Sequence, residues 1–221
     1  MLGSMTVRAL MVIALVVSLA GCGGANVQLP SSGTDQLVIP TPSPDPDDFV
    51  RGVDNPWMPL PDGRTWTYQV VGVDGSDEQK VTVAAGPEVD GVPTTARVTT
   101  GPDTVTTDWF AQDAAGNVWW FGREGEWTAG TDGAEAGLAM AADPRVGDGY
   151  RTAYQRGVVE DVATVLALDG SATVPAGSYD DLVVTRDTSE TGSVEQSWAR
   201  GIGLVEATRP GQTVRLTKVS S

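Results

Sequence analysis

The chain has 221 residues and a formal net charge of −15 at pH 7, with no histidine and a single cysteine. The negative charge argues against binding to nucleic acid and against lying flat on an anionic lipid surface, because both would repel the protein. Without histidine, a Ser-His-Asp triad and histidine-ligated zinc are excluded. With 40% hydrophobic residues, the chain can form one packed domain that does not depend on disulfides.

Residues 1–21 predict an export signal. Ala9 to Ala20 is an apolar run of 12 residues, whereas a bilayer-spanning helix needs about 20. The run ends in Leu19-Ala20-Gly21-Cys22, which resembles a bacterial lipoprotein signal. That resemblance implies cleavage before Cys22, acylation of its thiol, and anchoring of the protein to the extracytoplasmic face of the cell membrane. The alternative is an ordinary secretory signal followed by an unrelated cysteine.

Residues 22–52 follow the signal and are predicted to be a disordered tether. They are rich in proline, serine and aspartate and contain few large apolar side chains. Proline favours extended polyproline II backbone, and so few apolar groups cannot offset the entropy lost on ordering. A spacer is therefore expected, with recognition of the Pro40–Pro46 segment by a proline-binding module as the alternative.

Residues 53–221 are predicted to form a single all-β domain. Short β-branched and aromatic runs are interrupted by glycine and aspartate every few residues, which is typical of an antiparallel sheet built of hairpins. We expect a curved sheet or half-barrel with strands over residues 64–73, 79–84, 94–100, 104–112, 117–122, 151–155, 159–168, 181–187, 194–199, 205–208 and 213–219. Residues 133–142 have helical composition, and a short helix or irregular crossover is expected there.

The most distinctive part of the domain is an aromatic hairpin, Asp108-Trp-Phe-Ala-Gln-Asp113 followed by Val118-Trp-Trp-Phe-Gly122. With Asn55-Pro-Trp-Met-Pro-Leu60 and Val146-Gly-Asp-Gly-Tyr-Arg151, it resembles a family of secreted bacterial proteins without assigned activity. The resemblance covers roughly residues 55–165 and implies a shared fold and an envelope location. It implies no catalytic or ligand-binding residues.

Alternation along the hairpin predicts which aromatic side chains share a face. Trp109 lies with Ala111 on one face of its strand, opposite Phe110, and Trp119 lies opposite Trp120 on the next strand. We expect Trp109 and Trp119 to be core residues and Trp120 to be half-exposed. The tryptophans of the hairpin are thus predicted to stabilise the fold first, and a role in ligand binding is secondary.

The C-terminal part has a looser resemblance, carried by Val174-Pro-Ala-Gly-Ser-Tyr179 and Trp198-Ala-Arg-Gly-Ile-Gly203. These segments are similar to the closing hairpins of half-barrel envelope proteins such as lipoprotein carriers of the LolA type. That resemblance implies a concave apolar face able to hold an acyl chain. A curved sheet with a filled core explains the same residues without a ligand and is the preferred interpretation.

Catalysis, if present, would depend on carboxylates, and the candidates near the aromatic hairpin are Asp108, Asp113, Glu124, Glu126, Asp132, Glu160 and Asp161. Two carboxylates about 5–9.5 Å apart could hydrolyse a glycosidic bond. Trp109, Trp119, Trp120 and Trp127 could stack on sugar rings. In an acidic β protein, however, such groups more often occupy solvated turns and the core. The segment from Asp113 to Asn117 lacks the alternating oxygens of a calcium loop, and no metal or cofactor is predicted.

The sequence therefore predicts a membrane-anchored envelope lipoprotein whose β domain binds or scaffolds rather than catalyses. A concave sheet that holds an apolar or lipid ligand is left open beside the preferred filled core. The alternative is a carboxylate-based glycan hydrolase or glycan-binding module that uses tryptophan stacking. Apart from the lipid on Cys22, the sequence identifies no ligand or protein partner.

Overall fold

The computed structural model describes residues 45–220. The predicted signal, Cys22 and most of the predicted tether lie outside the described residues. Within residues 45–220, no helix is long and apolar enough to cross a membrane.

The described residues are nearly all β-structure, which confirms the predicted fold class. A single 3-10 turn, η2 (Pro46–Asp48), precedes the strands. The strands are β1 (Phe49–Val50), β2 (Thr65–Gly72), β3 (Gly75–Val89), β4 (Val92–Thr100), β5 (Val105–Asp113), β6 (Val118–Arg123), β7 (Trp127–Thr128), β8 (Glu135–Met140), β9 (Gly149–Gln155), β10 (Val159–Val174), β11 (Gly177–Ser189), β12 (Gly192–Ala199), β13 (Gly203–Arg209) and β14 (Gln212–Ser220).

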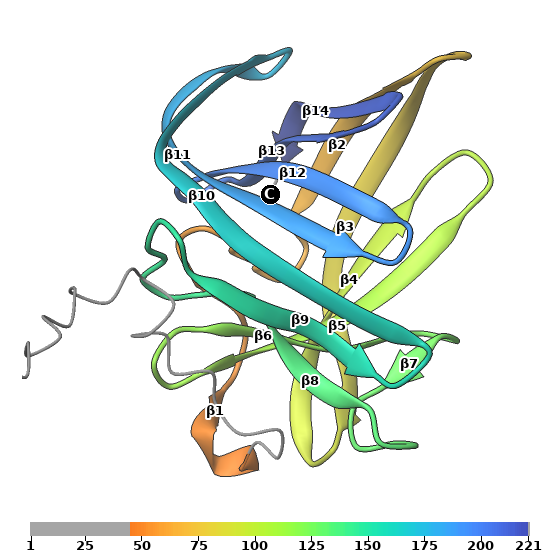
Figure 1. Cartoon of the computed structure of the whole chain (residues 1–221), viewed down its shortest axis with the longest axis vertical. Helices are drawn as coiled ribbons and strands as arrows, with labels where there is room; N and C mark the ends of the chain where they lie inside the picture. Colours follow the sequence, from red (N-terminus) through yellow and green to blue (C-terminus); the bar gives the residue numbers. More distant parts are fainter. Residues whose placement is uncertain (1–44, 221) are drawn as a thin grey trace, which may run out of the picture. The chain divides into compact units, whose positions relative to one another are not determined.

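The antiparallel sheet closes on itself into a barrel-like ring of 12 strands. Strand order runs from β5 through β4, β3, β2 and β14 down to β8 and β6, and β6 pairs back onto β5. The short strands β1 and β7 extend this ring on β5 and β6. In Figure 1, β9 to β12 cross in front of β3 to β5, so the two sets form facing walls.

Local sequence signals correctly predicted most of the hairpins. The strands over residues 64–73 and 79–84 pair across their turn as β2 and β3, and the aromatic hairpin forms as β5 and β6. β10 and β11 are longer than predicted, because they continue to a tight turn at Pro175 and Ala176. Register shifts along this hairpin bend the strands and allow the sheet to curve.

Residues 133–142 differ from the prediction, because they contain strand β8 and no helix. The alanine-rich composition favours a helix locally, but β8 pairs with β6 on one side and β9 on the other, and these ladders override local propensity. Gly137 is required by this packing. A Cβ at that position would overlap the backbone of Thr152, so any larger residue would push β8 away from β9.

Residues 46–50 also differ, since they were expected in the disordered tether but form the 3-10 turn η2 and the short strand β1. β1 pairs with the end of β5, and the Phe49 ring packs edge-on against Phe121 with centroids 5.2 Å apart. This contact of a partly buried ring with a fully buried one holds the chain where it enters the domain.

Candidate functional site

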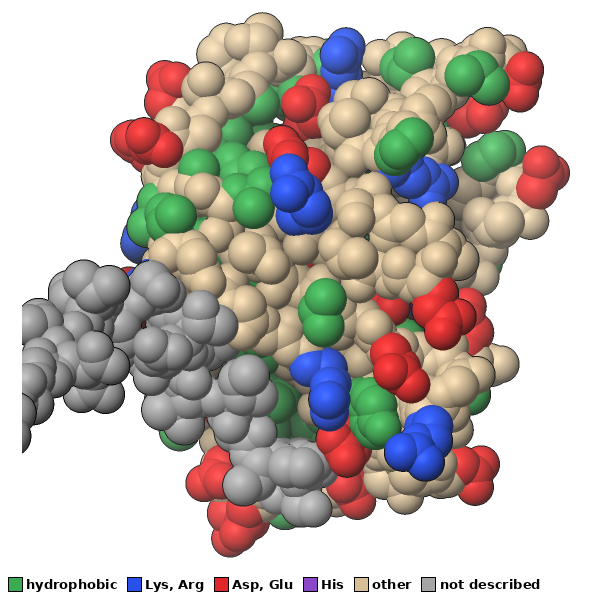
Figure 2. All heavy atoms as spheres, in the orientation of Figure 1, with side chains coloured by type: hydrophobic (Ala, Val, Ile, Leu, Met, Phe, Trp, Pro, Cys, Tyr) green, Lys and Arg blue, Asp and Glu red, His purple; other side chains and the backbone are tan. Residues whose placement is uncertain are grey.

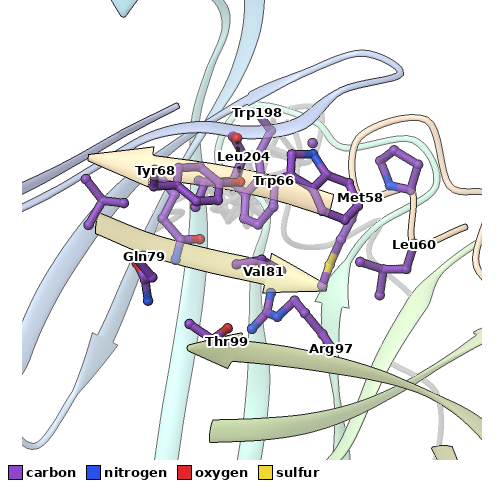
Figure 3. Close-up of a pocket in the computed structure, with 14 residues that line it drawn as sticks. Met58, Leu60, Trp66, Tyr68, Gln79, Val81, Arg97, Thr99, Trp198 and Leu204 are labelled. Carbon is purple, nitrogen blue, oxygen red and sulfur yellow. Dashed lines mark hydrogen bonds between the residues drawn. The ribbon is translucent and has the colours of Figure 1, made fainter. Parts of the chain in front are cut away.

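The interior of the closed sheet contains a cavity of about 180 Å³ with a mainly apolar lining. Figure 3 shows side chains of β2, β3 and β4 projecting into the same space. Its lining includes Leu60, Trp66, Tyr68, Val81, Trp198, Leu204 and Val214. Trp66 and Tyr68 are fixed by hydrogen bonds to the carbonyl oxygens of Ile202 (2.8 Å) and Leu204 (3.0 Å). The apolar wall is therefore preformed.

A second cavity, of about 230 Å³, adjoins the first and is lined by more charged side chains; we call it the polar cavity. The two share Met58, Arg97, Gln196 and Trp198. The second lies between the facing walls, and its lining adds Phe110, Trp120, Arg123, Thr152, Asp161, Asp187 and Thr188. An apolar compartment thus continues into one that holds charged groups.

A third cavity, of about 350 Å³, lies beside the hairpin turn that contains Gly101 and Pro102. It shares Gln79 and Val214 with the apolar cavity and Val194 with the polar one. It therefore adjoins both interior cavities next to the ends of the strands.

The Asn-Pro-Trp-Met segment places Met58 inside the barrel-like sheet, between the two interior cavities. The buried Asn55 amide donates to the carbonyl oxygens of Gly116 (2.8 Å) and Ala141 (3.2 Å). Its side-chain oxygen accepts from the backbone N–H groups of Trp57 (2.9 Å) and Met58 (3.1 Å). These hydrogen bonds hold the segment from Asn55 to Met58 in place, so this sequence motif has a structural role.

A buried carboxylate with two guanidinium groups lies on one wall of the polar cavity. Asp108, whose side chain is 2% exposed, accepts from Arg97 (2.9 Å) and Arg123 (2.7 Å). The two guanidinium groups lie over the rings of Phe110 (4.7 Å) and Trp120 (5.2 Å), which stack with each other. Strands β4, β5 and β6 supply these side chains, and we call this set the arginine wall.

The facing wall carries two carboxylates with no hydrogen bond or ion pair among the described residues. Asp161 on β10 and Asp187 on β11 are half-buried and line the polar cavity. Burial raises the pKa of Asp161, against the opposing charge of Arg123. Burial and the negative charge of Asp161 raise the pKa of Asp187 to about 7, although Arg97 opposes this shift.

Tyr150 on β9 lies in register with Asp187. Tyr150 pairs with Ala163 of β10, and Ala163 pairs with Asp187, so all three side chains share one face of the sheet. The Tyr150 hydroxyl is buried without a hydrogen-bond partner among the described residues. Burial, with the charges of Asp187 and Asp148, raises the pKa of this hydroxyl. Tyr150 does not itself line the polar cavity, and we call Asp161 and Asp187 the carboxylate wall.

The carboxylates predicted from the sequence are not brought together. Asp108 is ion-paired, and the Asp113 carboxylate accepts hydrogen bonds from Asn117 and Trp119. Four others lie on the exposed outer surface: Glu124, Glu126, Asp132 and Glu160. Of these predicted carboxylates, only Asp161 lines the polar cavity, and Asp108 is bonded to two arginines that line it. Among the described residues, no three Asp, Glu, His or Cys side chains form a group that could hold a metal ion.

The tryptophans divide as alternation predicts, with one exception. Trp119 is buried, whereas Trp120 pairs with Phe110 and lines the polar cavity. Trp109 is only half-buried, although it was expected in the core. A β-bulge next to Trp109 shifts the register there, and its ring lies beside Gly122.

Sequence analysis gave no role in a site to Asp187, Arg97 or Tyr150, although Tyr150 lies in the Val146–Arg151 segment. Asp187 alternates with Val183 and Thr185, both buried, so its inward direction could have been inferred from the strand pattern. Arg97 gave no such signal, because an arginine in a strand normally faces solvent.

No protein-family model matches the chain, and no curated protein matches it. One similar solved structure is a proposed exported protein with a YmcC-like fold from Bacteroides fragilis. It is 13% identical with a TM-score of 0.42, and the match covers 75% of this chain and 99% of that one. Another is a proposed lipoprotein from Parabacteroides distasonis, at 13% identity and a TM-score of 0.38, covering 74% and 98%.

Proposed function

We propose that this chain is a lipid-anchored envelope protein whose β domain binds a small amphipathic ligand without transforming it. The observation that carries the proposal is the pair of adjoining cavities inside the closed sheet, one apolar and one charged. Ligand sites combine an apolar lining with a few placed polar groups, as these cavities do. An apolar part of the ligand would occupy the space beside Trp66 and Leu204, and its polar part would occupy the charged compartment.

The surface supports a small ligand rather than a nucleic acid. On the face in Figure 2, acidic side chains are spread over several regions and basic side chains stand apart from one another. This agrees with the formal charge of −15 and offers no extended track for a polyanion.

The glycan hydrolase alternative is not favoured by the arrangement of the side chains. Asp108 is held by two arginines, and Glu124 and Glu126 lie outside the cavities. Asp161 and Asp187 lie on neighbouring strands, so they line the same side of the cavity and do not flank a bond between them.

Native mass spectrometry of the domain purified from its own host tests ligand binding. We expect a small molecule to be released on denaturation of the wild-type protein and to be absent from a Val81→Phe variant, whose larger side chain fills the apolar cavity. Val71→Phe is the matched control, since Val71 is exposed on β2. If the wild-type protein carries no molecule, or if both variants keep it equally, binding inside the sheet is wrong.

Membrane anchoring is tested separately by cell fractionation. Cys22 is the sole cysteine, so a Cys22→Ser variant should leave the membrane fraction and lose the mass of its acyl groups. Equal membrane retention of both proteins would contradict the lipid anchor.

A further inference from the structure

We infer that the polar cavity receives the ammonium group of an amphipathic organic cation, with Asp187 and Asp161 as its acceptors. This inference rests on the proposed binding function and names its ligand class. It starts from the contrast between the arginine wall, whose charges are paired within the fold, and the carboxylate wall, whose charges are not.

The arginine wall offers little to an anionic ligand. Both guanidinium groups are hydrogen-bonded to Asp108, and each also lies over an aromatic ring. The Nε atom of Arg97 is unpaired but buried, so a molecule in the cavity does not reach it. The positive groups are thus already committed to interactions within the protein.

The carboxylate wall offers acceptors. Asp161 and Asp187 both line the polar cavity, and neither is hydrogen-bonded among the described residues. Carboxylate oxygens that border a cavity without a partner in the fold are available to a hydrogen-bond donor that enters it. An ammonium group carries three N–H donors and can bond to both carboxylates together.

The charges in the cavity favour a cation as well. Asp108, Asp161 and Asp187 face Arg97 and Arg123, which leaves an excess of one negative charge when all three carboxylates are ionised. A single ammonium group would neutralise that excess. The strongly acidic protein surface would also raise the local concentration of cations.

The apolar part of the ligand has a place beside the ammonium site. Trp198 lines both cavities and is held by a hydrogen bond of 3.1 Å from its indole nitrogen to Thr185. Its ring can contact either the alkyl chain or the ammonium group. From there the lining continues to Leu204 and Trp66. The cavities therefore fit a primary alkylamine of moderate length.

Three probes of equal chain length separate charge from apolarity: octylammonium, octanoate and octanol. Each is titrated into the purified domain below its micelle concentration at pH 8, and binding is followed by calorimetry and by the shift in Tm. We expect octylammonium to bind and raise Tm, and the other two to bind at least about tenfold more weakly, because only the amine pairs with the carboxylates.

Asp187→Asn should weaken octylammonium binding at least about tenfold and leave octanol binding unchanged. Asp180→Asn is the matched control, since it removes the same charge from an exposed position on β11. Tyr150→Phe removes a hydroxyl that is buried outside the cavity lining, so it should leave amine binding nearly unchanged while the domain stays folded.

The outcomes separate the two proposals. If octanoate or octanol binds as well as the amine, and Val81→Phe abolishes that binding, the cation class is wrong while ligand binding inside the sheet stands. If Asp180→Asn and Asp187→Asn weaken amine binding equally, the effect is one of net charge and the assigned acceptors are wrong. If no probe binds the wild-type domain, the inference is overturned and the native mass spectrometry decides the binding function.

Discussion

The arginine wall and the carboxylate wall face the same cavity but satisfy their charges differently. On β4 to β6, Asp108 is almost fully buried and bonded to Arg97 and Arg123. On β10 and β11, Asp161 and Asp187 line the cavity without a bonded partner among the described residues. A paired buried charge serves the fold, because removing one partner leaves the other unsatisfied. An unpaired one costs folding free energy and is retained where it serves another purpose.

The contrast predicts opposite signs for substitutions on the two walls. Substitutions in the arginine wall, or of side chains packed behind it, should destabilise the domain. Changes to the carboxylate wall should stabilise it while weakening ligand binding.

The largest effect is expected for Trp119→Ala, behind the arginine wall. The Trp119 side chain is buried, and its indole nitrogen donates to Asp113 at 2.9 Å. The loss should be about 3–5 kcal/mol of unfolding free energy, from the cavity that is created and the hydrogen bond that is lost. Trp120→Ala should cost less, because its ring already borders open space. Urea denaturation of both variants measures the difference, and equal losses would show that burial does not distinguish the two rings.

Asp108→Asn should cost about 3 kcal/mol, near the lower end for a broken buried ion pair. The loss is moderated because the side chains of Arg97 and Arg123 are 27% and 30% exposed and can be hydrated. Asp103→Asn, in an exposed turn, is the control and should have little effect. A change below about 1 kcal/mol for Asp108→Asn would mean that the arginine wall is not held by this carboxylate.

Asp187→Asn should instead stabilise the domain by about 1–2 kcal/mol at pH 8. The unfolded carboxyl titrates near its ordinary pKa of about 3.9, whereas the folded-state pKa is about 7. Between these values the folded state keeps a proton that the unfolded state has lost, so wild-type stability falls as pH rises from about 4 to about 7. Asp161, Arg97 and Tyr150 face this group and act on the same equilibrium.

Urea midpoints of the wild-type and Asp187→Asn proteins, measured from pH 4.5 to 8, check this prediction. The gap should open as pH rises and level off above about pH 7. A constant gap, or a variant that is less stable at pH 8, would show that the ionised Asp187 is compensated in the folded state.

The hairpins could be predicted from the sequence because their signals are local. Alternation and turn residues define the pairing of β2 with β3 and of β5 with β6. Ring closure could not be predicted in this way, since it depends on pairing between β2 and β14 at opposite ends of the domain. The strand over residues 135–140 was missed for the same reason, because its partners and not its composition make it a strand.

The candidate site was predictable only in part. Asp108 and Asp161 were among the sequence candidates because they are carboxylates near tryptophans, but that criterion also selected Glu124 and Asp132 on the surface. The carboxylates near the cavity differ from those on the surface in whether the side chain points into or out of the sheet. This direction follows from alternation only after the strand and its inner face are known, and this is why Asp187 was missed.

The smallest effect is expected for Glu126→Gln, which tests whether nearness to the tryptophans in sequence carries any function. The Glu126 side chain is 57% exposed and lies 3.8 Å from Arg123 in a solvent-exposed pair. Such pairs contribute little, so the change in unfolding free energy should be below about 0.5 kcal/mol. Octylammonium affinity should also be unchanged, because Glu126 does not line the polar cavity. If Glu126→Gln weakens the amine as much as Asp187→Asn does, the outer surface of the aromatic hairpin takes part in binding, and the contrast between the two walls does not define the site.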